Sequence, residues 1–227
     1  MNRPFLKVGY VGLLVIIMSV TLVIIFPSKA PKMPDGFFTP IIAFEFIKTK
    51  AEVFQLFVAT DGTTRQAMVN AMDLGNRLDY IYMCLYSVFF LLFCQKCADI
   101  SKKKLYYTGM AIAVVVLLGD ALENRQLLGI TAKLENGDFA AELSLLYFFT
   151  WIKWGGIAAV FLLLVPWFAK GGLFSKTIGM AGSITIALGV LAFLNRSMIT
   201  EIFSLAVGLM FLFMIIYCFT FKSDEIL

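Results

Sequence analysis

Two carboxylates interrupt an apolar stretch of this chain, LLGDALENRQLLGI at 117–130. A helix would place Asp120, Glu123 and Asn124 on one face together with Leu127, because side chains three and four residues apart lie one above the other. An unpaired charge in hydrocarbon costs at least about 2.5–3.5 kcal/mol, and intramembrane charges commonly mark binding sites and ion or proton pathways. The spacing therefore predicts a polar helix face that accepts a proton or a cation, or supplies a general base.

A second segment offers residues to face this one. In LDYIYMCLY at 78–86, Asp79 and Tyr82 share a helical face with Tyr86. Tyrosines at such positions more often pack or mark the membrane interface than line a ligand site. We nevertheless include Asp79 and Tyr82 among the candidate ligand-binding residues, with Asp120, Glu123 and Asn124.

Lys153 is the candidate counter-charge, and it allows two interpretations. It lies in an apolar stretch between Trp151 and Trp154. If it points inward, it pairs with Asp120 or Glu123. If it points outward, it extends to the lipid headgroups among interfacial tryptophans.

The elements that position these residues are membrane-spanning helices. Apolar residues make up 60% of the 227 and charged residues 15%, and the mean hydropathy is +0.88. A soluble domain has roughly 45–50% apolar and 25% charged residues. The composition predicts an all-α, polytopic membrane protein in contact with lipids, and the net charge of +4 is too diffuse to indicate nucleic acid.

Six windows of about 20 apolar residues, the length that crosses a bilayer core, recur along the chain. The first resembles a secretion signal, but its apolar run is too long and no A-x-A cleavage site follows, so we expect a retained helix. We predict a single transmembrane domain over 1–227, with spans near 8–26, 78–97, 105–126, 144–168, 177–195 and 202–221.

The short loops predict the orientation of these spans. Of the 19 basic and 15 acidic residues, the segments on the N-terminal side hold nine basic and three acidic, which leaves ten and twelve for the remainder. Positive charge concentrates on the cytoplasmic side of membrane proteins. We therefore expect both termini in the cytoplasm, at a bacterial inner membrane.

The long connection at 27–77 is then outside. Thr39 is placed to cap a helix that has Pro40 at its first position. In the following stretch, apolar residues gather near one helical face, so 41–58 is expected to form an amphipathic helix that lies on the membrane or covers the bundle.

Counting residues along the helices gives the depth of the candidate site. From Lys104 to Asp120 is 16 residues, or about 24 Å, and similar counts run from the inner lysines of two neighbouring spans. They bring four side chains to one level just inside the outer edge of the core: Asp79, Asp120, Glu123 and Lys153. Asn195, Arg196 and Glu201, which bound the last outer loop, are expected to join this layer.

Several chemistries are absent from the sequence. There is no histidine, which excludes histidine-ligated haem and Ser-His or Cys-His nucleophilic pairs within this chain. Cys94 and Cys97 form an isolated C-x-x-C, a weak signal for redox or metal use. We predict no metal and no cofactor.

Three motifs together resemble a group of uncharacterised bacterial multi-span membrane proteins that has no established activity. The motifs are FEFIKTKAE at 44–52, LDYIYMCLY at 78–86 and GDALEN at 119–124. The resemblance covers the first 130 residues or so and implies an inner-membrane setting. It also draws attention to Glu45, beside Asp79, Asp120, Glu123 and Asn124, but it transfers no reaction.

Three classes of function stay open. We expect an outward-facing polar pocket that binds or transports an ion, a proton or a small amphiphile. The first alternative is a non-catalytic partner or assembly subunit, in which the polar layer specifies packing. The second is an enzyme that acts on a lipid headgroup by carboxylate acid/base chemistry, although we expect that the chain is not an enzyme.

Overall fold

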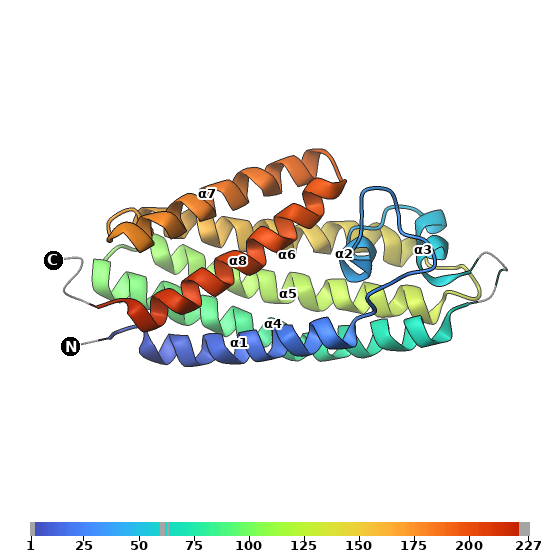
Figure 1. The fold of residues 1–227 in the computed structure, drawn as a ribbon, viewed down its shortest axis with the longest axis horizontal. Coiled ribbons are helices and arrows are strands. Elements are labelled where there is room, and N and C mark those ends of the chain that lie inside the picture. Colours follow the sequence, from blue (N-terminus) through green and yellow to red (C-terminus); the bar gives the residue numbers. More distant parts are fainter. Residues whose placement is uncertain (1–2, 60–61, 63, 223–227) are drawn as a thin grey trace.

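The computed structural model describes residues 3–59, 62 and 64–222, and the regular elements in these residues are helices (Figure 1). Six of the helices are long and apolar enough to cross a membrane. Every predicted span is confirmed. The helices are α1 (Leu6–Ile25), α2 (Pro40–Glu45), α3 (Lys50–Phe57), α4 (Gln66–Ser101), α5 (Leu105–Ala132), α6 (Ala140–Phe168), α7 (Leu173–Leu194) and α8 (Met198–Thr220).

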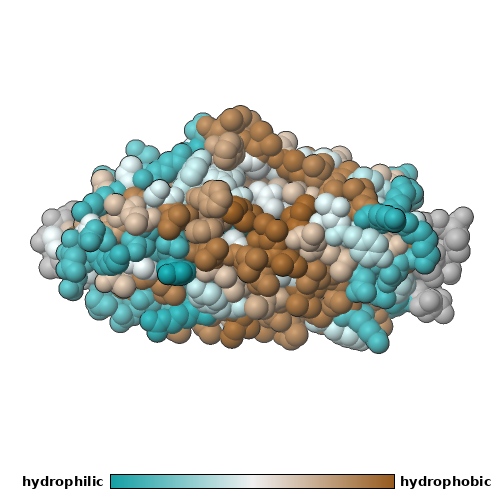
Figure 2. Space-filling model, turned by 180° about the vertical axis from the view of Figure 1, so that it is seen from behind, coloured by the Kyte–Doolittle hydropathy of each residue, from teal (hydrophilic) through white to brown (hydrophobic). Residues whose placement is uncertain are grey.

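The six long helices form a closed ring. Each one packs against the next in chain order, and α8 returns to pack against α1, which in turn packs against α4. These helices carry apolar residues on all sides, which is typical of membrane spans. One side of each helix contacts lipid, and the other side packs against neighbouring helices. On the face that Figure 2 shows, an apolar belt crosses the middle of the molecule, with hydrophilic residues at both ends.

Several helices are longer than their apolar windows. The second predicted span begins at Gln66 rather than near residue 78, so α4 has 36 residues and is about 54 Å long. Since a bilayer core is about 30 Å thick, the first turns of α4 and the last turns of α5 extend beyond it. These extensions lie beside α2 and α3 at one end of the molecule (Figure 1).

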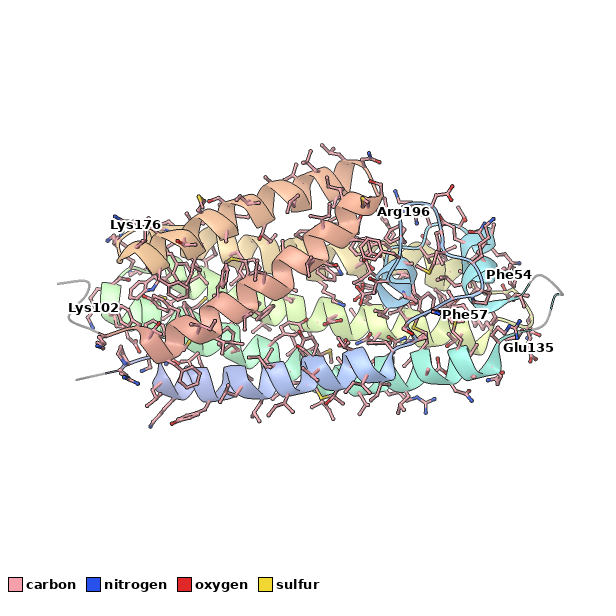
Figure 3. All side chains as sticks on the ribbon, in the orientation of Figure 1. Phe54, Phe57, Lys102, Glu135, Lys176 and Arg196 are labelled. Atoms are coloured by element: carbon pink, nitrogen blue, oxygen red, sulfur yellow. The ribbon has the colours of Figure 1, made fainter. Side chains whose placement is uncertain are left out.

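We call residues 39–57, which include α2 and α3, the cap, and the end of the bundle that they cover the cap end. Figure 3 places Phe54, Phe57 and Arg196 at the cap end, and Lys102 and Lys176 at the opposite end, where both chain termini lie. We call that opposite end the terminal end.

The cap consists of two short helices instead of the single helix predicted for 41–58. The break has a local cause, because Thr49 begins a new helix with a capping box. Its hydroxyl accepts a hydrogen bond from the Glu52 amide at 3.2 Å, and the Glu52 carboxylate accepts one from the Thr49 amide at 3.0 Å. The cap is also more buried than a helix lying on the membrane, since Phe44, Ile47, Val53 and Phe57 have no exposed surface.

Candidate functional site

The polar face predicted on α5 points into the bundle. Asp120, Glu123 and Leu127 have no exposed surface, and Asn124 is 1% exposed. Gly119 lets α6 approach this face, because a Cβ at this position would lie 3.1 Å from the Ile152 Cβ and 3.3 Å from the Lys153 amide nitrogen. The close approach brings the α5 carboxylates beside Lys153.

Lys153 points inward and contacts three carboxylates. Its Nζ lies 2.6 Å from Glu123 Oε2, 3.1 Å from Asp120 Oδ1 and 3.1 Å from Glu45 Oε1. The lysine is only 7% exposed. It therefore does not extend outward to the lipid headgroups, which was the second interpretation of its position. We call Glu45, Asp120, Glu123 and Lys153 the carboxylate–lysine cluster.

Glu45 is the member that the spacing of charges did not predict. It is the last residue of α2, and the cap carries it into the bundle. Its Oε2 accepts a hydrogen bond from Trp154 Nε1 at 2.9 Å, and its backbone carbonyl accepts one from Thr150 Oγ1 at 3.0 Å. The only sequence signal for this residue was the FEFIKTKAE motif, which did not predict where Glu45 lies relative to the other carboxylates.

The two tyrosines of the α4 face have different partners. The Tyr86 hydroxyl donates a hydrogen bond to Asp120 Oδ2, so this residue belongs to the site although it was not chosen as a candidate. The Tyr82 hydroxyl accepts a hydrogen bond from Ser19 Oγ of α1 at 3.1 Å and contributes to that helix contact instead. Tyr86 lies one turn of α4 beyond Tyr82 on the same face, and this is the turn that packs beside Asp120 of α5.

Asp79 lies beside the cluster and is linked to it through α5. Asn124 Nδ2 donates a hydrogen bond to Asp79 Oδ2 at 2.7 Å, and both residues are buried. Asp79 is not among the ion-pair partners of Lys153 in the described chain. The structure therefore brings five of the six predicted site residues together, with Asp79 and Asn124 as a pair next to the cluster.

The charge of the cluster is unbalanced. If its three carboxylates were all ionised, the single ammonium of Lys153 would leave two negative charges buried. Burial raises the pKa of Glu45, and the nearby Asp120 charge adds to this effect, while Lys153 and the Trp154 hydrogen bond oppose it. The Glu123 Oε1 atom is also buried and has no hydrogen-bond donor among the described residues.

The predicted outward-facing pocket is closed in this structure. Asp120 and Glu123 have no exposed surface, and Glu45 and Lys153 are each only 7% exposed. The reason is the cap, which comes from a distant part of the sequence and places buried side chains such as Phe44 and Phe46 over this end. Counting residues along the spans could give the depth of the cluster but not what covers it.

On its other side the cluster meets a block of aromatic rings. The Tyr86 ring lies 6.3 Å from that of Phe90, whose ring lies 4.8 Å from Phe211 and 5.7 Å from Phe161. All four side chains are buried. The interior of the bundle towards the terminal end is thus packed with apolar rings.

The residues that bound the α7–α8 loop hold the cap and not the cluster. Glu201 Oε1 accepts hydrogen bonds from the Phe38 and Thr39 amides at 3.0 and 2.8 Å. Arg196 pairs with Glu52 and donates to the Phe46 carbonyl at 2.6 Å. In the described residues neither Arg196 nor Glu201 forms an ion pair or a hydrogen bond with the cluster, so the expectation that they join its layer stays a prediction.

The cysteines add no site. Cys94, Cys97 and Cys218 are buried free thiols, and Cys84 is exposed on the lipid-facing side of α4. Among the described residues, no group of histidine, cysteine, aspartate and glutamate side chains is arranged to hold a metal ion.

No family model matches the chain, and no curated protein or solved structure is significantly similar to it. The resemblance of its three motifs to bacterial multi-span membrane proteins stays a prediction.

Proposed function

We propose that this multi-pass membrane protein binds an exchangeable proton in the carboxylate–lysine cluster. The observation that carries the proposal is that three buried carboxylates share the single ammonium of Lys153. In the setting that we propose, a bacterial inner membrane with both termini in the cytoplasm, the cap end faces outward.

Charge balance supports a proton as the ligand. A buried charge without a partner costs several kcal/mol, and like charges that share a site do not all ionise. Protonation of one carboxyl removes one of the two unpaired charges without any rearrangement of the helices. Glu45 is the best candidate for the acceptor, since burial raises its pKa and it enters the site from the cap.

Binding is better supported than passage through the bundle. A transport path would have to continue from the cluster towards the terminal end, where the Phe90, Phe161 and Phe211 rings are packed together. An enzyme that acts on lipid headgroups would need a carboxylate that a substrate can reach, and Asp120 and Glu123 have no exposed surface. A proton needs the least access of any ligand.

The second candidate is a non-catalytic partner or assembly subunit. It is favoured by the number of polar contacts that hold the cap to the bundle, from Lys153 and Trp154 to Glu45 and from Glu201 to the Phe38 and Thr39 amides. In that case the cluster fixes the position of the cap, and no proton is exchanged.

Infrared difference spectroscopy of the protein in lipid nanodiscs separates the two candidates. Between mildly acidic and alkaline buffer, wild type should lose the C=O stretching band of a buried protonated carboxyl. Glu45→Gln should remove or shift this band because it replaces the acceptor with an amide of the same shape. Glu135→Gln, at an exposed carboxylate of the α5–α6 loop, is the matched control and should leave the band unchanged.

A wild-type spectrum without such a band at any pH would refute proton binding and leave the assembly candidate. A band that persists unchanged in Glu45→Gln would keep the proton in the cluster but assign it to another carboxyl.

A further inference from the structure

An apolar groove runs between α6 and α7 on the outer surface of the ring, away from the carboxylate–lysine cluster. It has a volume of about 420 Å³, and its floor is formed by small residues of α6, among them Gly155, Ala158 and Ala159. Its walls include Leu162, Val190 and Phe193, which are 54%, 56% and 53% exposed. Since both helices are spans, this groove opens to the hydrocarbon of the bilayer.

The groove adjoins a small, mainly aromatic depression at the cap end. Trp151 and Phe193 line both, and their rings meet edge to face with centroids 5.0 Å apart. The depression adds Tyr147, one turn of α6 closer to the cap, and the cations Lys48 and Arg196. Aromatic residues at this depth are typical of the boundary between hydrocarbon and headgroups.

Lys48 supplies the unpaired positive charge of the depression. Its side chain is exposed, its Nζ lies 5.2 Å from the centre of the Tyr147 ring, and it has no ion pair in the part of the chain that the structure describes. Arg196 is neutralised by Glu52. The surface therefore places an apolar groove below a free cation at the membrane boundary.

We propose that this surface binds one glycerophospholipid, with an acyl chain in the α6–α7 groove and the phosphate beside Lys48. A phospholipid joins an apolar chain to an anionic group, and this surface joins an apolar groove to a cation in the same order. A helix of a partner protein, about 10 Å across with its side chains, would fill the apolar part but leave Lys48 without an anion. Charge complementarity thus favours the lipid.

Trp151 provides a reporter inside the groove, since Trp154 and Trp167 are buried in the protein. We would reconstitute the protein in phosphatidylcholine vesicles that contain a fraction of brominated phosphatidylglycerol or of brominated diacylglycerol. Bromine on an acyl chain quenches a tryptophan that it contacts. The Trp151 signal is the difference between wild type and Trp151→Phe.

Two variants test the two parts of the site, each with a matched control. Gly155→Leu fills the groove, and a Cβ at residue 155 meets no atom within 4 Å, so the fold should tolerate it. Gly208→Leu is the control, because this lipid-facing glycine of α8 is equally unobstructed but lies outside the groove. Lys48→Gln removes the cation, and Lys50→Gln removes a neighbouring one that lies over Phe54 instead.

We expect phosphatidylglycerol to quench Trp151 at a lower membrane fraction than diacylglycerol does. Lys48→Gln should weaken this preference roughly fivefold, the effect of one basic residue at a charged membrane surface, and Gly155→Leu should abolish it. Both controls should behave as wild type.

Equal quenching by both lipids in wild type would mean that the groove meets only bulk lipid, and would overturn the proposal. Weak quenching together with a cross-linked dimer through the groove would assign it to a second copy of the chain instead. Neither result bears on the proton-binding proposal, which depends on residues inside the ring.

Discussion

At the scale of single residues, the site depends on one lysine that forms ion pairs with three carboxylates. Lys153 reaches Glu45, Asp120 and Glu123 within 3.1 Å, and Tyr86 and Trp154 supply further hydrogen bonds to two of these carboxylates. Such a buried network is costly if any member loses its partner. If Glu45 takes up the proton as proposed, its protonation should therefore be coupled to how firmly the cap is held.

The pH dependence of stability should show this coupling. The pKa of Glu45 is raised from its ordinary value of 4.5 by burial, so above that value the folded protein retains a proton that the unfolded chain has lost. This contribution to stability is complete below pH 4.5 and is lost as the pH rises through the folded pKa. Wild type should therefore become less stable over this window, and Glu45→Gln, which cannot ionise, should show a flatter profile in thermal unfolding.

Glu52 gives a comparison of opposite sign within the same cap. Burial raises the pKa of Glu52, but the Arg196 hydrogen bond and charge and the Lys48 and Thr49 amides outweigh it, so the net pKa is lowered from 4.5. Its contribution is present above that value and is lost only as the pH falls through the folded pKa. If Glu45→Gln altered stability only on the acid side of the profile and left the loss of stability above pH 4.5 unchanged, our account of Glu45 would be wrong.

At the scale of elements, the contact between α5 and α6 decides whether the cluster forms. Gly119 is a point of close approach next to the cluster, where an added Cβ would lie 3.1 Å from the Ile152 Cβ. Two helices can come this close only where one of them has no side chain.

Gly119→Val should push α6 away from α5 and lengthen the Lys153 contacts. Overpacking of this kind typically costs about 1–3 kcal/mol, which a denaturant titration of the purified protein would measure. Gly208→Val on α8 is the matched control and should have little effect, because an added Cβ there meets no atom within 4 Å. Equal stability of the two variants would show that the close contact between α5 and α6 at Gly119 does not contribute to the stability of the fold.

The structure of the cap depends on both a local sequence signal and a tertiary contact. Thr49 and Glu52 start α3 through a capping box that is visible in the sequence as T-K-A-E. The break before α3 turns α2 into a separate short helix, which inserts Glu45 between α5 and α6 through the ion pair with Lys153. A single amphipathic helix lying on the membrane could not have placed Glu45 there.

At the scale of the whole molecule, the ring of six helices has two distinct ends. The cap, Arg196 and Glu135 lie at one end, while Lys102 and Lys176 lie at the other with both termini (Figure 3). The excess of basic residues in the short loops of the terminal end predicts that this end is cytoplasmic.

Cysteine labelling tests this orientation. A membrane-impermeant maleimide applied to intact spheroplasts should label Glu135→Cys in the α5–α6 loop and should not label Lys103→Cys in the α4–α5 loop until the cells are permeabilised. Both residues are exposed. The native protein is the background control. Cys94, Cys97 and Cys218 are buried, and the exposed Cys84 lies in the middle of span α4, where an impermeant reagent should not reach it. The reverse labelling pattern would place the cap end in the cytoplasm.

The sequence by itself determined the all-helical, multi-pass character and the six apolar helices, and it predicted a common level for Asp79, Asp120, Glu123 and Lys153. These features follow from hydrophobic length and from a fixed rise per residue, which are local properties of a helix. The inward face of α5 also followed from its spacing of three and four residues.

Only the tertiary structure decided which residues complete the site and whether it is open. The choice of Tyr86 over Tyr82 depends on which turn of α4 packs beside Asp120, and the entry of Glu45 depends on where the cap folds back. Both are relations between elements distant in sequence, and no periodicity within one segment encodes them. For the same reason, the polar layer predicted as an open pocket became a closed cluster, because the cap, which ends 63 residues before Asp120 in the sequence, covers it.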